Sequence, residues 1–130
     1  MKAQWDKYPN FSKEEFNCKH SGKNEMQHEF MKKLQALREF YGKPLKVTSG
    51  YRDYTHPEEV KKPNKNGAHP TGKAVDLAVD RKDAHKVLEL AMSLGFSGIG
   101  IKQHGDSRFI HLDTIEDNPL QPRPTIWSYK

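Results

Sequence analysis

Two stretches of the chain repeat apolar residues at the spacing of an amphipathic helix. The first follows Asn24, a residue type that caps helices, and ends at Gly42. Its apolar residues recur at helical spacing, mostly three or four positions apart: Met26, Phe30, Met31, Leu34, Leu37 and Tyr41. The second stretch, rich in leucine and alanine, ends at Gly95. Such spacing places one apolar stripe on a helix, and glycine is a common C-terminal stop. We therefore predict helices over residues 25–41 and 81–94.

Shorter apolar runs predict β-strands. They cover residues 45–49, 74–79, 98–101 and 108–113. Asp76 interrupts the second run, and His111 and Asp113 alternate with apolar residues in the fourth. Because side chains alternate across a strand, His111 and Asp113 are expected on one face. Without a repeat or a linker, residues 1–130 form one predicted α+β domain.

Two polar stretches are predicted to be irregular. Residues 50–67 are rich in proline, lysine and asparagine, and a loop of this length favours a functional role. The proline-rich tail ends with Trp127 and Tyr129, whose rings either pack on the core or line a cleft.

Composition narrows the class of protein. Lys and Arg total 22 and Asp and Glu total 17, so the formal charge is +5. This charge suits an anionic partner such as nucleic acid, anionic lipid or an anionic cell wall. Only 34% of the residues are hydrophobic, a small supply for a core. Cys18 is the only cysteine and is expected to pack in the core, so a bound metal rather than a disulfide would add stability.

Targeting signals are not evident in the sequence. No apolar run is long enough to span a membrane, so no membrane insertion is expected. The N-terminal segment has no apolar region of the signal-peptide kind, so we expect synthesis in the cytoplasm without such a signal.

His69, Asp76 and His111 are the candidate metal ligands. A carboxylate inside an apolar strand is costly unless it is paired or binds a metal. Two imidazoles and one carboxylate suit a catalytic zinc, which keeps a fourth position for water. In the alternative interpretation both histidines are core residues with satisfied hydrogen bonds and Asp76 caps a turn. Spacing alone leaves both possibilities open.

Three segments, in order along the chain, resemble motifs of the M15 family of zinc peptidases. Residues 69–76 (HPTGKAVD) are similar to its H-x-x-G-x-A-x-D motif. Residues 48–52 (TSGYR) resemble its S-G-Y-R segment, and residues 109–113 (FIHLD) its F-V-H-x-D strand. The ends of the chain also fit the branch that contains many phage and bacterial murein peptidases. The family comprises D-alanyl-D-alanine carboxypeptidases and L-alanyl-D-glutamate endopeptidases of peptidoglycan.

This resemblance implies a fold and a site. The fold is a small antiparallel sheet with helices packed on one side. Zn²⁺ is bound by His69, Asp76 and His111, and Arg52 steadies the substrate carbonyl and the developing oxyanion. Zinc polarises a carbonyl and activates water, and a guanidinium offsets oxyanion charge, so the implied roles are chemically consistent. The alternative for Arg52 is a surface ion pair.

The general base is predicted differently from the family pattern. Several members have an acid three residues before the third ligand, where this chain has Arg108, and a related H-x-H arrangement would need histidine in place of Phe109. Asp113 is the candidate base because it shares a face with His111. Orientation of a ligand histidine is its alternative role. Asp106 and His104 are the reserve candidates.

The expected function is zinc-dependent hydrolysis of peptide bonds in peptidoglycan stem peptides. We expect a monomer that acts at the cell wall as a phage endolysin released by a holin, or as a virion-associated enzyme. Lys61, Lys62, Lys65 and Lys73 either attract an anionic wall polymer or simply form a solvated loop. The alternative function is a non-catalytic, zinc-stabilised domain that binds wall polymer or a partner protein. No nucleic-acid motif accompanies the charge, so no nucleic-acid partner is expected.

Overall fold

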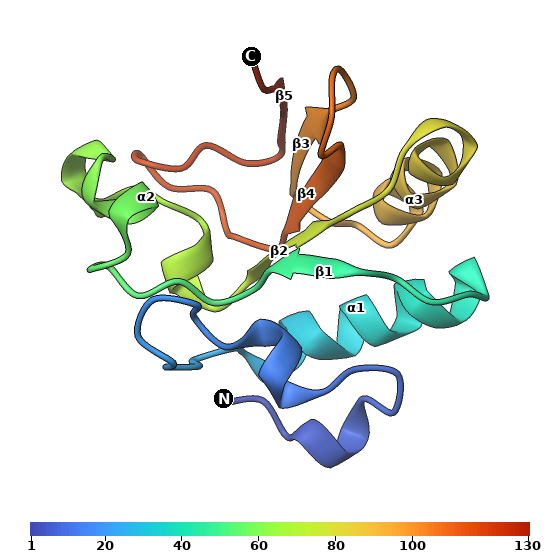
Figure 1. The fold of residues 1–130 in the computed structure, drawn as a ribbon, viewed down its shortest axis with the longest axis horizontal. Coiled ribbons are helices and arrows are strands. Elements are labelled where there is room, and N and C mark those ends of the chain that lie inside the picture. Colours follow the sequence, from blue (N-terminus) through green and yellow to red (C-terminus); the bar gives the residue numbers. More distant parts are fainter.

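A five-stranded sheet forms the centre of the structure, a computed structural model that describes all 130 residues (Figure 1). In order across the sheet the strands are β1 (Val47–Ser49), β2 (Ala74–Leu77), β4 (Phe109–Asp113), β3 (Gly98–Lys102) and β5 (Thr125–Ser128). Neighbours from β1 to β3 pair antiparallel, whereas β5 pairs parallel with β3. The sheet is therefore mixed.

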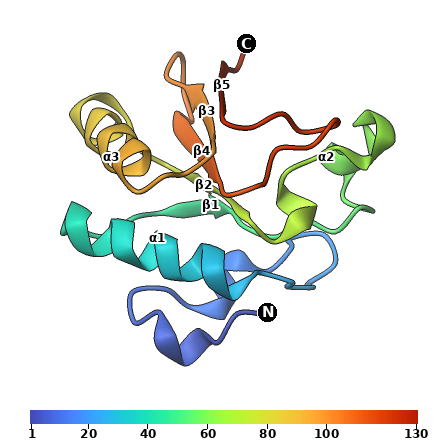
Figure 2. The same ribbon diagram turned by 180° about the vertical axis from the view of Figure 1, so that it is seen from behind.

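The two long helices, α1 (His28–Tyr41) and α3 (Arg81–Ser93), pack on one side of the sheet. The one-turn helix α2 (Pro57–Val60) and the connection from β4 to β5 lie on the other side, as both ribbon views show (Figures 1 and 2). Four 3₁₀ turns complete the structure: Trp5–Lys7, Lys13–Phe16, Pro63–Lys65 and His69–Thr71. None of the helices is both long and apolar enough to cross a membrane.

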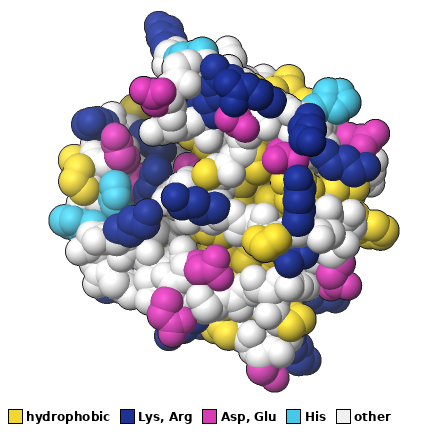
Figure 3. All heavy atoms as spheres, turned by 45° about the vertical axis from the view of Figure 1, so that its right-hand side comes forward, with side chains coloured by type: hydrophobic (Ala, Val, Ile, Leu, Met, Phe, Trp, Pro, Cys, Tyr) yellow, Lys and Arg dark blue, Asp and Glu magenta, His cyan; other side chains and the backbone are white.

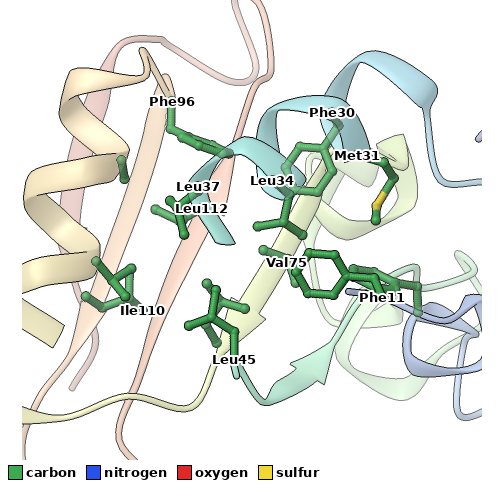
Figure 4. Close-up of a cluster of buried hydrophobic side chains, with 14 of the residues drawn as sticks. Phe11, Phe30, Met31, Leu34, Leu37, Leu45, Val75, Phe96, Ile110 and Leu112 are labelled. Atoms are coloured by element: carbon green, nitrogen blue, oxygen red, sulfur yellow. The ribbon is translucent and has the colours of Figure 1, made fainter. Parts of the chain in front are cut away.

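Side-chain alternation separates the two faces of the sheet. Val75, Ile110 and Leu112 join the hydrophobic core with residues of α1 such as Phe30 and Leu34 (Figure 4). Asp76, next to Val75, and His111, between Ile110 and Leu112, point to the opposite face. Cys18 is buried in the same core, as predicted. One face of the sheet thus holds the fold together and leaves the other free for polar groups.

The surface charges are mixed on the side of the molecule that carries α3. There, Lys and Arg side chains lie among Asp and Glu side chains and around hydrophobic atoms (Figure 3). The net positive charge is not gathered into one continuous basic stripe on this face.

The α+β fold with a small sheet is confirmed, and three details of the prediction are wrong. The first helix begins at His28 rather than after Asn24, because the Asn24 side chain accepts a hydrogen bond from the Met26 N–H and Gln27 is held in a bridge with Lys2. The loop over 50–67 contains helix α2. The tail predicted as irregular contributes strand β5, which makes the sheet mixed rather than purely antiparallel.

Candidate metal centre and cleft

The three predicted metal ligands meet on the polar face of the sheet. Asp76 of β2 and His111 of β4 are directly paired residues, and Asp76 Oδ1 lies 3.0 Å from His111 Nδ1. His69 comes from the turn that leads into β2, and its Nε2 lies 3.3 Å from the same oxygen. All three residues are buried, and their ligand atoms lie within 4.8 Å of one another. Two imidazole nitrogens and one carboxylate oxygen therefore converge on one point.

The turn that carries His69 depends on Gly72. Gly72 has a left-handed conformation, with φ of 75°, which favours glycine. A Cβ at this position would also lie 2.0 Å from the carbonyl oxygen of Glu25. The Gly72 carbonyl in turn accepts a hydrogen bond from the Gln27 N–H just before α1. The glycine of the H-x-x-G segment thus lets the turn sit tightly against the start of α1.

The second nitrogen of each histidine is held by the protein. His69 Nδ1 lies 2.7 Å from the carbonyl oxygen of Gly50, and His111 Nε2 lies 2.8 Å from Asp113 Oδ2. Both oxygens are acceptors, so each of these nitrogens can donate a hydrogen bond to its partner. The His69 Nε2 and His111 Nδ1 atoms are thereby turned toward Asp76. Orientation of this kind is typical of histidines that bind metals.

Charge coupling within the cluster alters the pKa values of its members. Burial raises the pKa of Asp76, but the two adjacent imidazoles more than offset this effect and the net pKa is well below the ordinary value. Burial lowers the pKa of His111, and hydrogen bonds to Asp113 and Asp76 outweigh it, so the net pKa is raised. The cluster therefore keeps an ionised carboxylate at its centre, as a cation site requires.

Asp113 lies behind His111 rather than in the open cleft. Its carboxylate has no exposed surface and receives two hydrogen bonds from Arg123, of 2.9 and 2.8 Å, besides the bond from His111. The Ile115 N–H adds a fourth contact at 3.3 Å. Both oxygens are thus occupied by donors. These contacts match the alternative kept for Asp113, orientation of a ligand histidine, and its role as general base stays a prediction.

Arg52 lies at the edge of the cluster. Its Nη2 is 3.8 Å from Asp76 Oδ2, and its Nη1 donates a hydrogen bond of 3.1 Å to Glu59. The side chain retains 19% of its exposure. Arg52 is therefore partly buried between two carboxylates and is not the surface ion pair considered as its alternative.

A cleft of about 640 Å³ opens over the cluster. Its aromatic residues include Phe109, Trp127 and Tyr129, and its cations are Arg52, Lys62 and Arg123. The Trp127 ring centroid lies 5.1 Å from that of His111. Burial and the nearby Asp76 raise the pKa of Tyr129 to about 12, so this hydroxyl stays neutral. The two tail aromatics both pack on their neighbours and line the cleft.

Two glycines of β3 make room on the polar face. A Cβ at Gly98 would lie 2.2 Å from Asp113 Oδ1, and a Cβ at Gly100 would lie 2.7 Å from the Trp127 ring. Gly100 is paired with both His111 and Trp127 across the sheet. Alternate glycines in β3 therefore allow Asp113 and Trp127 to approach the sheet closely.

Several predicted residues lie away from the cluster. His104 and Asp106 are exposed in the turn between β3 and β4 and do not line the cleft. Arg108 donates a hydrogen bond back to the Gly105 carbonyl. Of the four lysines named from the sequence only Lys62 lines the cleft.

Two functional candidates were missed from the sequence, Glu59 and Arg123. Both lie in segments without periodic pattern. Their importance follows only from side-chain contacts with Arg52 and Asp113, seven and ten residues away, which no local pattern indicates.

The residues present fit a bound metal ion, because three donors of suitable type converge and the remaining histidine nitrogens are satisfied. A comparison with protein-family models matches residues 9–113 to the family described as Peptidase M15. A search among curated proteins gives no match. The matched segment contains Arg52 and all three clustered ligands and covers most of the chain. The chain belongs to the Peptidase M15 family.

Proposed function

We propose that this peptidase is zinc-dependent and hydrolyses peptide bonds in the stem peptides of peptidoglycan. The observation that carries the proposal is the convergence of His69 Nε2, Asp76 Oδ1 and His111 Nδ1 on one point beneath an open cleft. Three protein ligands of nitrogen and oxygen type are the donor set of catalytic zinc sites. When bound, zinc supplies a Lewis acid that polarises a carbonyl and activates water.

The side chains around the cluster have separate roles in this proposal. Arg52 presents a guanidinium beside Asp76, where it offsets negative charge that develops on the carbonyl oxygen of the bond being cut. Asp113 and Arg123 hold the His111 ring in one orientation. Trp127 and Tyr129 form an apolar wall that excludes water from one side of the peptide.

The openness of the cleft and the net charge of the protein support a peptide of the cell wall as substrate. The cleft opens to solvent above the cluster, so a peptide segment can enter it from the surface. The net charge of +5 favours approach to an anionic polymer. Together with the sequence resemblance to murein peptidases, these features support action at the cell wall, as a phage endolysin released by a holin or a virion-associated enzyme.

Digestion of purified peptidoglycan tests the proposal. Mass spectrometry of the soluble products should show newly cleaved stem peptides with the zinc-loaded protein. A chelator should abolish them, and added zinc should restore them. His111→Ala should be inactive, whereas His85→Ala, which alters an exposed histidine on α3, should match wild type.

Two results would contradict this assignment. Cleavage that persists in the presence of the chelator would exclude the metal-dependent mechanism. A zinc-loaded protein that releases no product would favour the non-catalytic wall-binding alternative.

A further inference from the structure

Helix α2 carries a carboxylate into the interior of the loop that leads to the cleft. His56 caps the helix by accepting the Glu58 N–H at its Nδ1, and Pro57 occupies the first helical position, which proline favours. Val60 in this short helix is exposed, but Glu59 retains only 3% of its exposure. The fold therefore buries the one acidic residue of α2 that points inward.

Only one oxygen of the buried Glu59 carboxylate accepts hydrogen bonds, and it accepts them from two cations. Glu59 Oε2 accepts 3.1 Å hydrogen bonds from both Arg52 Nη1 and Lys62 Nζ. Glu59 Oε1 is the one buried side-chain oxygen or nitrogen without a hydrogen-bond partner. A buried ion pair with an unsatisfied oxygen contributes little to stability, because desolvation offsets the attraction. A role in fixing Arg52 accounts better for this arrangement.

We propose that Glu59 is a positioning residue that fixes the Arg52 guanidinium at the edge of the metal-ligand cluster. This inference rests on the proposed peptidase function, in which Arg52 offsets oxyanion charge. The guanidinium is a rigid planar fork, so holding Nη1 on Glu59 also fixes where Nη2 points. Nη2 then lies 3.8 Å from Asp76 Oδ2, toward the cleft. Glu59 itself touches no ligand of the cluster and acts through Arg52.

Gly67 is part of the same arrangement. A Cβ at Gly67 would lie 1.8 Å from Glu59 Oε1 and 3.0 Å from its carboxyl carbon. A larger residue would force the Glu59 carboxylate to move or rotate. Glycine thus allows the close approach of Glu59 here, and Gly67→Ala provides a second way to disturb the contact with Arg52.

The main test compares Glu59→Gln with Glu89→Gln. Both replace a carboxylate that is paired with a lysine, but Glu89 pairs with Lys86 on the exposed face of α3, so Glu89→Gln controls for loss of charge. With muropeptides as substrate, Glu59→Gln should lower kcat about tenfold or more and leave KM within about twofold, because a misplaced group that acts only in the transition state lowers kcat. Zinc affinity, measured by competition with a chelator, should stay at the wild-type value.

Dependence on Arg52 separates positioning from general support of the fold. Gly67→Ala should reproduce the loss of kcat. Glu59→Gln should lower kcat much less in the Arg52→Lys protein than in wild type, because the guanidinium that it positions is already gone. A Glu59→Gln protein with kcat within twofold of wild type overturns the proposal. An equal loss in both backgrounds also overturns it.

The guanidinium NMR signals of Arg52 keep this test independent of catalysis. In wild type these signals should be resolved, and in Glu59→Gln they should be averaged by rotation. Unchanged signals overturn the positioning role. If zinc-loaded wild type releases no peptide, the proposed function fails, but the NMR comparison still decides whether Glu59 fixes Arg52.

Discussion

Asp113 Oδ2 lies 2.8 Å from His111 Nε2, on the side of the imidazole ring opposite to Asp76. The residues are two apart on β4, so they share a face of the strand, and their mutual contact leaves His111 Nδ1 toward the cluster. The shared face thus places Asp113 against His111, as orientation of a ligand histidine requires, and its role as general base stays a prediction.

Replacing Asp113 distinguishes these two roles. Asp113→Asn should lower zinc affinity about 10- to 100-fold, because the carboxylate no longer fixes the His111 ring. Competition with a chromophoric chelator measures the affinity. Unchanged zinc affinity together with lost hydrolysis would instead support Asp113 as the general base.

Arg123 should be important for stability even without metal. Its guanidinium donates two hydrogen bonds to the fully buried Asp113, so Arg123→Met would leave a buried carboxylate with one partner fewer. We expect the free energy of unfolding to fall by about 3 kcal/mol, as for other buried pairs that lose one member. Urea unfolding of the zinc-free protein, prepared with a chelator, measures this change in the free energy of unfolding.

The matched control for Arg123 is Arg81→Met. Arg81 pairs with Asp80 at the surface, where the side chain is 75% exposed. Loss of that pair should cost under about 1 kcal/mol. If both substitutions lower the free energy of unfolding equally, the buried pair contributes no more to stability than the exposed one.

Gly100→Ala should disturb the aromatic wall of the cleft. The added Cβ would lie 2.7 Å from the Trp127 ring and 2.8 Å from the Tyr129 ring, so both rings must move. Overpacking of this kind costs about 1–3 kcal/mol. Thermal unfolding should show the loss, and the fluorescence of Trp127 should change. A fully wild-type melting curve would argue against close packing of β5 on β3.

Zinc should stabilise the folded protein. Binding to the folded state alone adds about 2.7 kcal/mol to the free energy of unfolding when free zinc is 100 times Kd. Calorimetry with and without zinc should therefore show a higher Tm for the loaded protein. His69→Ala should remove the difference, and His85→Ala should retain it. Equal Tm values for wild type with and without zinc would contradict the proposed metal centre.

One pH effect is expected where the end of α1 meets the start of α3. A 2.6 Å hydrogen bond from Lys43 lowers the pKa of the Asp83 carboxyl below its ordinary value of 3.8. The folded-state pKa is depressed, so this stabilisation is present above pH 3.8 and is lost as the pH falls through the folded-state value. NMR titration should give a midpoint below 3.8, and Lys43→Met should move it upward. An unmoved midpoint would exclude Lys43 as the cause.

Two of the candidate metal ligands could be predicted from the sequence because each stands out within its own segment, as a polar residue in an apolar run. Asp76 stood out as a charge within an apolar run, and His111 lay at an alternate position of another. The structure places these two residues opposite each other in adjacent strands. His69 opens the run that contains Asp76, the motif resemblance added Arg52, and all four residues line one cleft.

What the sequence did not reveal depends on contacts between distant segments. Strand β5 is stabilised by parallel pairing with β3, which no local pattern around its prolines indicates. Likewise, the start of α1 is delayed by the bridge between Lys2 and Gln27. Glu59 and Arg123 gain their roles from partners seven and ten residues away that are also placed by tertiary structure.

The late position of Arg123 and β5 in the chain has a consequence for biosynthesis. His69, Asp76 and His111 leave the ribosome before Arg123 and Trp127 do, so a nascent chain presents its ligands before their support exists. Until β5 docks beside β3, Asp113 is without Arg123 and the cleft is without its Trp127 wall. We therefore expect the ligand cluster to gain its full support only when the sheet is complete, and not when the ligands themselves emerge.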